Sequence, residues 1–387
     1  MTTSTAKYEQ AAGSRPQAVK TLILVCLLPA ACCLLSAAPA RADDALRTEI
    51  VTVAKGIAEA VKGLGHEAIA VGEFTGPAPL AASGGPLIVK TLTEELPKQG
   101  LAVKQGAIVG LKGEFEDVKD MQSGLLAARI KGTVTDRSGQ VLFTFTRGVF
   151  GDTALAALFG TTAKLPADLP PAERNAELEK SLDKPKVVVN GARVSAAADS
   201  PYAVEILAAP QPGGKYAAKT ASIDGGQAFV PLSQGEVFGV RLINKSPHDA
   251  AVTLTIDGLS LYAFSDVKDP KTGRPRYTVI IVPAGQEVFL RGWHRTNEVA
   301  EEFTITQYAK SAAAELKSTA PTGTVTAAFA AAWPVDKAPP ADEPPSQAQN
   351  SRSGEAVGRG ARVGQKFVEV QRHIGVVRAT VSVRYTK

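Results

Sequence analysis

Residues 377–385 read Val-Arg-Ala-Thr-Val-Ser-Val-Arg-Tyr, a run in which apolar and polar side chains alternate. A period of two is typical of a β-strand with one face packed on a core. Shorter runs with this period occur between residues 237 and 329, separated by turn sequences such as Pro283-Ala-Gly285. Because short alternating strands at this spacing are typical of sandwiches, we expect residues 200–387 to form an antiparallel β-sandwich domain.

The segment before the last strand has a different composition. Residues 334–366 are rich in Pro, Ser, Gln and Gly, which is typical of mobile segments. Since a strong strand follows, we interpret 334–366 as a mobile insert within the sandwich domain. Tyr308–Lys317 is the one helix that we expect in this half of the chain.

The first half of the chain contains both helical and strand periods. Apolar residues recur every three or four positions from Leu46 to Leu64, which predicts an amphipathic helix that ends at Gly63 and Gly65. Further elements are expected at these positions: a buried strand at 67–74, a helix from Ser83, one or two strands within 103–118, a hairpin at 126–145 that turns at Asp136-Arg-Ser-Gly139, and a short helix at 153–159.

This order of elements predicts a small α/β domain at 43–160, with helices packed on a mixed sheet. Residues 161–199 are interpreted as a linker, because they begin with a proline-rich stretch and hold one charged helical segment at 172–182. The fold class that we expect for the whole chain is therefore α+β.

The N-terminus has the pattern of an export signal. The apolar run Leu22–Leu35 follows Arg15 and Lys20 and precedes Ala40-Arg-Ala42. This order is typical of a secretory signal peptide, so we interpret 1–42 as a signal peptide cleaved after Ala42. The protein is then expected to be exported to the periplasm, the outer membrane surface or the extracellular space.

Two alternatives for this leader stay open. Ala30-Ala-Cys32 has the small residues that lipoprotein processing needs, so lipidation of Cys32 would anchor the protein by acyl chains. The other alternative is an uncleaved membrane anchor. In our interpretation, a membrane is contacted only through such an anchor.

Charge and cysteine content exclude several function classes. The 387 residues carry a net charge of +5, of which +3 lies in residues 1–42, so the remainder is nearly balanced at +2. We therefore expect no nucleic-acid partner. All three cysteines lie in the leader, at Cys26, Cys32 and Cys33. The mature chain is then cysteine-free, which excludes thiol catalysis, disulfides and cysteine-ligated metals.

Strong catalytic motifs are missing from the sequence. Its four histidines lack metal-ligand spacing, and there is no Gly-x-Ser-x-Gly elbow or phosphate-binding loop. We expect no catalytic residue, no bound metal and no cofactor.

Gly292-Trp293-His294-Arg295 is the most chemically suggestive cluster. An exposed Trp293 indole beside a basic group would stack on a sugar or bind a partner protein, and His294 is part of this candidate site. Tyr262 and Tyr277 are further stacking candidates. In the alternative interpretation, Trp293 packs as a lid on the sandwich core.

Three further candidate sites come from Asp257-Gly258, from His294 with Asp257, and from three arginines near the C-terminus. Asp257-Gly258 follows a strand and favours a turn over a catalytic role. A hydrolase site would need His294 as base with Asp257 as its orienting partner. Arg372, Arg378 and Arg384 form either a basic patch for anionic polymer or lipid headgroups, or a solvated strand face.

Residues 45–160 resemble a known kind of domain. The resemblance rests on the motifs Ile69-Ala-Val-Gly-Glu-Phe-Thr-Gly76, Ser83-Gly-Gly, Gly113-Glu-Phe115 and the turn Asp136-Arg-Ser-Gly139. Together they are similar to the small α/β domain of bacterial envelope accessory lipoproteins of the curli-secretion, flagellar accessory and penicillin-binding-protein activator type. The resemblance implies an assembly or activation module and no enzyme. The pore-forming hairpins of the curli channel have no counterpart, so no channel is expected.

Residues 200–387 resemble uncharacterised secreted bacterial β modules. The motifs are Asn244-Lys-Ser246, Leu254-Thr-Ile-Asp-Gly-Leu259, Gly292-Trp293 and Phe303-Thr-Ile-Thr306. This resemblance implies no activity.

These observations favour a non-catalytic, exported adaptor or assembly accessory protein of the cell envelope. Its expected partner is an envelope protein or a polysaccharide. The alternative is a secreted carbohydrate-binding protein of the cell surface, and a third hypothesis is an unrecognised hydrolase. The sequence leaves the oligomeric state open.

Overall fold

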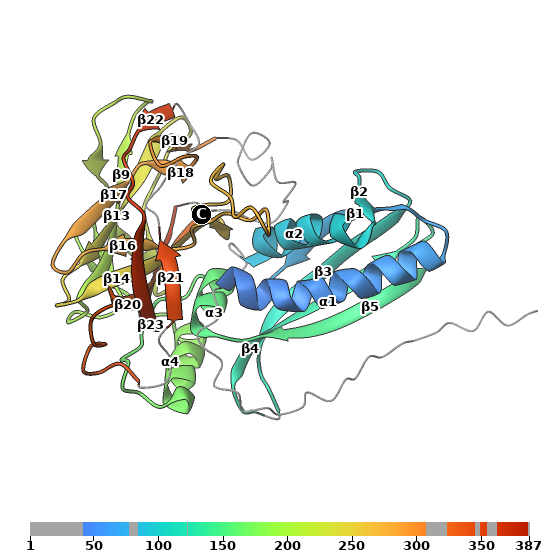
Figure 1. The fold of residues 1–387 in the computed structure, drawn as a ribbon, viewed down its shortest axis with the longest axis horizontal. Helices are drawn as coiled ribbons and strands as arrows, with labels where there is room; N and C mark the ends of the chain where they lie inside the picture. The colour runs from blue at the N-terminus through green and yellow to red at the C-terminus, as the bar shows by residue number, and fades with distance from the viewer. Residues whose placement is uncertain are drawn as a thin grey trace, which may run out of the picture. The chain divides into compact units, whose positions relative to one another are not determined.

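The described strands form three β-sheets, and helices pack on the first of them (Figure 1). The computed structural model describes residues 42–76, 84–121, 123–306, 323–344, 349–353 and 362–385. The helices are α1 (Ala42–Gly63), α2 (Gly84–Glu95), α3 (Asp152–Phe159) and α4 (Pro171–Asp183), with a 3₁₀ turn at Pro97–Gln99. The predicted α+β fold class is confirmed.

The first sheet has the order β2-β1-β3-β4-β5. Its strands are β1 (Ala68–Thr75), β2 (Ala102–Val103), β3 (Val109–Lys119), β4 (Leu126–Thr135) and β5 (Val141–Val149). β1 is parallel to β2 and β3, whereas β3, β4 and β5 are antiparallel, so the sheet is mixed as predicted. α1 and α2 pack together on it, α1 against β5 and α2 against β1 (Figure 1).

The spacing of apolar residues explains how α1 packs. Leu46, Ile50 and Ile57 are each at most 1% exposed, and they lie on one face of the helix. Leu64 was expected on the same face but is 55% exposed. It lies beyond the end of the helix, where Gly65 takes a positive φ of 83°.

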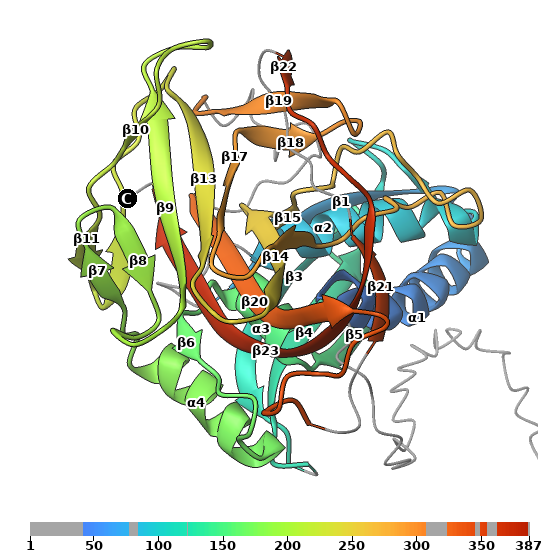
Figure 2. The same cartoon turned by 60° about the vertical axis from the view of Figure 1, so that its left-hand side comes forward.

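The other two sheets lie in the second half of the chain (Figure 2). One has the order β18-β19-β13-β9-β8-β7, with β10, β17 and β22 paired at its sides. Its strands are β7 (Val188–Asn190), β8 (Arg193–Ser195), β9 (Tyr202–Ala209), β10 (Ala217–Ala218), β13 (Val237–Asn244), β17 (Glu287–Leu290), β18 (Gly292–His294), β19 (Val299–Thr304) and β22 (Arg362–Gly364).

The remaining sheet has the order β11-β12-β23-β20-β14-β15, with β6, β16 and β21 at its sides. Its strands are β6 (Ala163–Lys164), β11 (Ser222–Asp224), β12 (Gln227–Phe229), β14 (Asp249–Ile256), β15 (Leu259–Ser260), β16 (Ile280–Val282), β20 (Thr324–Pro334), β21 (Gln349–Ser353) and β23 (Val370–Arg384). β23, which holds most of the alternating run 377–385, is central and pairs with four other strands.

Both of these sheets contribute side chains to one hydrophobic core. Val204 and Val240 come from one sheet, and Val252, Phe329 and Val381 come from the other. A shared core between two sheets is the arrangement expected of a sandwich. The pairing is antiparallel except between β12 and β23, which are parallel over two residue pairs.

The predicted linker, residues 161–199, contains elements that pair with the β-rich half. β6 pairs with β23, and β7 and β8 continue the sheet that holds β9. α4 lies at 171–183, close to the charged helix expected at 172–182.

The predicted mobile insert, residues 334–366, also holds described elements. β21 pairs with β23, β22 pairs with β19, and Glu343 is buried. The helix expected at Tyr308–Lys317 lies outside the described residues, as do Cys32 and the rest of the leader before Ala42. None of the helices in the described part of the chain is long and apolar enough to cross a membrane.

Candidate functional site

The four aromatic and histidine residues proposed for ligand stacking lie together in the sandwich core. Trp293 is 5% exposed and contacts the rings of Phe264 and Phe303 edge-on. His294 lies between the Tyr262 and Tyr277 rings, at centroid distances of 5.3 and 5.7 Å. The structure therefore corrects the exposed-stacking interpretation: these side chains fill the core, as the alternative for Trp293 proposed.

The hydrolase arrangement is not formed. Asp257 lies in the two-residue turn between β14 and β15, with Gly258, and both have positive φ. Its carboxylate accepts hydrogen bonds from the Tyr385 hydroxyl and from two backbone N–H groups. Neither ring nitrogen of His294 makes a hydrogen bond with normal geometry to a described residue. The structure contradicts the Asp257–His294 pairing.

The environment of His294 also affects its protonation. Burial lowers the pKa of the imidazole to about 4, and the nearby Asn297 and Asp266 side chains oppose this only in part. His294 is therefore a neutral core side chain near pH 7.

The three arginines proposed as a basic patch are each engaged by another side chain. Arg372 donates to Asp249 at 2.9 Å, and Arg384 donates to Gln227 at 3.1 Å. Arg378 is 9% exposed and pairs with two carboxylates, so the basic-patch interpretation is wrong for it.

A surface pocket of about 660 Å³, here called the junction pocket, lies beside Arg378. Its lining comes from six segments: Lys164 of β6 with the residues after it, the start of β9, the β13–β14 loop, the end of β20, residues 338–342 and Arg378 of β23. Lys164, Asp168, Tyr202, His248, Trp333 and Arg378 are among the lining residues. Because segments far apart in the sequence meet here, the site depends on the tertiary fold.

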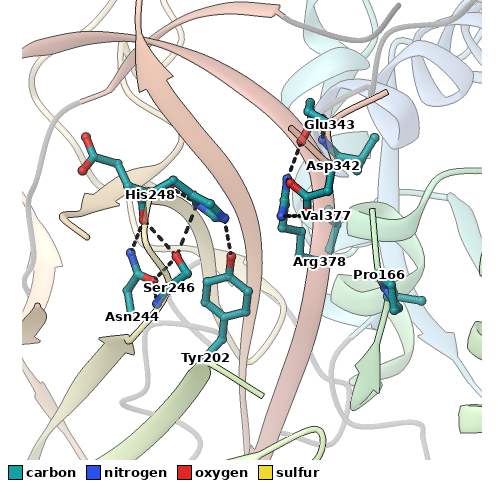
Figure 3. Close-up of polar contacts among 12 residues, drawn as sticks. Pro166, Tyr202, Asn244, Ser246, His248, Asp342, Glu343, Val377 and Arg378 are labelled. Carbon is teal, nitrogen blue, oxygen red and sulfur yellow. Dashed lines mark hydrogen bonds and ion pairs between the residues drawn. The ribbon is translucent and has the colours of Figure 1, made fainter. Parts of the chain in front are cut away.

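On one side of the junction pocket, a backbone carbonyl orients His248. The Nδ1–H group donates to the Asp249 carbonyl oxygen at 2.9 Å, which leaves Nε2 as an acceptor. The Tyr202 hydroxyl lies 3.5 Å from Nε2 (Figure 3). Burial lowers the pKa of His248 and raises the pKa of Tyr202, so both are neutral near pH 7.

The loop that carries His248 is fixed by Asn244 (Figure 3). The buried Asn244 amide donates to the carbonyl oxygens of His248 and Val282, at 2.9 and 3.0 Å. Its Oδ1 accepts from the Ser246 backbone N–H at 2.9 Å and from the Ser246 hydroxyl at 2.6 Å. Since the Ser246 proton is shared with Asn244 and the His248 Nδ1 carries its own proton, these two groups do not form a nucleophile–base pair.

An ion cluster forms the other side of the junction pocket (Figure 3). Arg378 donates through two nitrogens to Asp342 and through Nη2 to Glu343 at 2.9 Å. Burial lowers the pKa of Arg378, but hydrogen bonds to both carboxylates outweigh it and hold this pKa above its usual value. The same contact with Arg378 lowers the pKa of Asp342. Arg378 and Asp342 therefore stay charged and neutralise each other in part.

This arrangement suits binding better than chemistry. The polar groups of Asn244 and Ser246 and the two Nη atoms of Arg378 are already used in hydrogen bonds within the protein. Within the described residues, no group of three or more His, Cys, Asp or Glu side chains is placed to hold a metal ion. The pocket therefore offers shape, apolar contact and a few fixed polar atoms.

No family model matches the chain, and no curated protein matches it.

Sequence reasoning missed most of this site. Of the residues that line the junction pocket, only Arg378 was a candidate, and it was assigned to a surface patch. Asn244 and Ser246 were singled out as a motif, which the structure places in the loop that holds His248. An Asn two residues before a Ser is the pattern of a side-chain-stabilised turn, and this signal points to the loop.

Proposed function

We propose that this chain is an exported, non-catalytic adaptor of the cell envelope that binds a partner protein at the junction pocket. The observation that carries the proposal is the pocket itself, which is lined by six separate segments and has polar groups that are held by internal hydrogen bonds. A fixed concave surface of this kind binds without needing to rearrange.

Export rests on the leader sequence, and the envelope location rests also on the resemblance of residues 45–160 to envelope accessory domains. An adaptor needs a docking surface that is kept in shape. The buried Arg378 cluster supplies this, because it fixes residues 342 and 343 against β23.

One observation favours carbohydrate binding as the second candidate function. Trp333 and Tyr202 both line the junction pocket, and aromatic side chains are common in sugar sites. They are only 4% and 3% exposed, however, so little of either ring is accessible for a sugar to stack on. This geometry favours the adaptor over the carbohydrate-binding protein.

Photo-crosslinking in the native cell tests the proposal. A benzophenone amino acid replaces Ala338, an exposed residue that lines the junction pocket. The control replaces Ile223, which is 56% exposed and does not line the pocket. We expect a crosslink to one envelope protein at position 338 that is absent at position 223. The crosslink should also disappear when Ala341→Trp fills part of the pocket.

Three results would overturn the adaptor proposal. They are equal crosslinking at both positions, no protein crosslink at position 338, and turnover of a glycan or peptide substrate by the purified mature protein. Binding to a glycan array that Ala341→Trp abolishes would support the carbohydrate alternative instead.

A further inference from the structure

A second pocket of about 740 Å³, here called the acidic pocket, adjoins the junction pocket. Ala167, Asp168, Ala341 and Asp342 line both pockets, so the two are neighbouring parts of one groove. The acidic pocket is lined further by the start of β4, the segment after β5, the starts of α3 and α4, and residues 376–377 of β23. A ligand that fills this groove needs two anchoring groups joined by a connecting segment.

Part of the acidic pocket is apolar and accessible. Phe150, which follows β5, is 41% exposed, although most large apolar side chains in the described residues are buried. Leu125, Leu169 and several prolines line the same pocket. An exposed aromatic ring at the rim of an apolar recess is typical of a site that receives an apolar side chain.

The accessible charge of the acidic pocket is negative, and Lys164 of the junction pocket pairs with Asp199. Four carboxylates line the acidic pocket, from Asp152, Asp168, Asp342 and Glu343, against the one guanidinium of Arg174. The side chains of Asp342 and Asp152 are 51% and 26% exposed, whereas those of their partners Arg378 and Arg174 are 9% and 8% exposed. These two cations lie beneath the surface, whereas the carboxylates of Asp342, Asp152 and Asp168 are accessible to solvent and that of Glu343 is buried.

Asp168 lies where the two pockets meet. It is exposed, and no cation of the described residues forms a salt bridge with it. Arg174 fixes the segment before it, since its guanidinium donates to the carbonyl oxygens of Leu165 and Pro166 at 3.1 and 2.8 Å. The Asp168 carboxylate is therefore available to a ligand on a positioned backbone.

We propose that the junction pocket and the acidic pocket together bind an extended peptide segment of the partner, in which a Lys or Arg lies beside a large apolar side chain. This inference rests on the proposed function and specifies the chemistry of its partner. The cation of the peptide pairs with Asp168, and the apolar side chain packs beside Phe150. Charge complementarity selects a basic segment over an acidic one, because the acidic pocket exposes the carboxylates of Asp152, Asp168 and Asp342 while the guanidinium groups of Arg174 and Arg378 are buried.

A random peptide library displayed on phage and selected on the mature protein tests this inference. We expect the selected peptides to be enriched in Lys or Arg next to Leu, Phe, Tyr or Trp. A synthetic fluorescent copy of the strongest peptide should then bind Asp168→Lys at least tenfold more weakly than wild type. The matched control is Glu173→Lys, an exposed position on α4 that lines neither pocket, where we expect less than a twofold change.

The outcomes separate this inference from the proposed function. Selected peptides without basic residues, or equal binding by wild type and Asp168→Lys, would overturn the inference. So would failure to select any peptide, or displacement of the fluorescent peptide by millimolar spermidine alone, which indicates a small-cation site. If one of these results is obtained but the crosslink at position 338 is still found, the adaptor function is supported and only the inferred peptide chemistry of its partner is wrong.

Discussion

The Glu343 carboxylate lies 2.9 Å from the Arg378 guanidinium, and both side chains are almost completely buried. The other carboxylate oxygen accepts a hydrogen bond from the Val376 backbone N–H at 2.6 Å. At Gly375 a Cβ atom would overlap this carboxylate, so the missing side chain leaves the space that Glu343 occupies. Glu343 thus attaches the segment that includes residues 341 and 342, which line both pockets, to strand β23.

The first prediction concerns the loss of this contact. Glu343→Ala leaves Arg378 with only one carboxylate and leaves the Val376 N–H without its acceptor. Breaking a buried, hydrogen-bonded ion pair from one side is costly, so we expect the free energy of unfolding to fall by about 3 kcal/mol. Urea unfolding followed by circular dichroism measures this change.

A matched control separates the buried pair from an exposed one. Lys55 and Glu59 form a pair on α1 with side chains about 70% exposed, and we expect Glu59→Ala to change stability by less than about 0.5 kcal/mol. Equal losses in Glu343→Ala and Glu59→Ala would contradict a structural role for the buried contact.

The second prediction concerns the pH dependence of stability. The unfolded chain protonates His294 near its ordinary pKa of 6.5, but the folded protein resists protonation until about pH 4. The unfolded state therefore binds more protons in this window, and stability should fall as the pH decreases from 7 to 4, by about 3 kcal/mol from this residue. His248, whose pKa is also lowered by burial, acts in the same direction.

Substitution of His294 isolates its contribution. In His294→Phe and His294→Gln, the slope of unfolding free energy against pH between 4 and 7 should be shallower than in wild type. The slope is the readout, so a uniform loss of stability from imperfect packing does not affect the test. A slope unchanged in both variants would show that His294 does not titrate in this window.

The sequence predicts those elements whose period is long enough to distinguish buried positions from exposed ones. α1, β4 and β23 are such elements, and the structure places them near the expected positions. β18 has only three residues, all buried, and three residues carry no period. Trp293 and His294 lie on this strand, which explains why the sequence left two interpretations of Trp293 open and did not predict the burial of His294.

The site was harder to predict because it depends on long-range contacts. Tyr202, His248 and Arg378 meet only after β9, β14 and β23 have taken their places in two different sheets. Glu343 lies in a stretch whose Pro-rich composition indicates a mobile segment, and its burial follows from one specific partner on β23. Neither composition nor local period contains this information.

The third prediction compares two glycines on one strand. A Cβ at Gly113 would overlap the Lys131 carbonyl oxygen and the Phe74 ring, whereas a Cβ at Gly110 would meet no atom within 4 Å. We expect Gly113→Ala to lower the unfolding free energy by about 1–3 kcal/mol, because a rigid neighbour must move. Gly110→Ala should change it by less than about 0.5 kcal/mol, and thermal unfolding of both variants measures the difference. Similar melting temperatures for the two variants would contradict this close approach of Lys131 and Phe74 to Gly113.

The fourth prediction concerns the link between the β14–β15 turn and the end of β23. The Tyr385 hydroxyl is 2.6 Å from both Asp257 oxygens, and burial raises the pKa of Asp257 although Tyr385 and two backbone N–H groups oppose it. Tyr385→Phe removes a donor from a buried carboxylate, so we expect the free energy of unfolding to fall by about 1–3 kcal/mol at pH 7.

This loss of stability should depend on pH, because without the Tyr385 donor the pKa of Asp257 rises further. A raised pKa in the folded state means that the folded protein takes up the proton first, so the loss should shrink as the pH falls toward 4. Urea unfolding at pH 7 and pH 4.5, combined with Asp257→Asn in a double-mutant cycle, measures both effects. A loss that is independent of pH, together with zero coupling between the two positions, would show that the Tyr385 hydroxyl does not stabilise the charged form of Asp257.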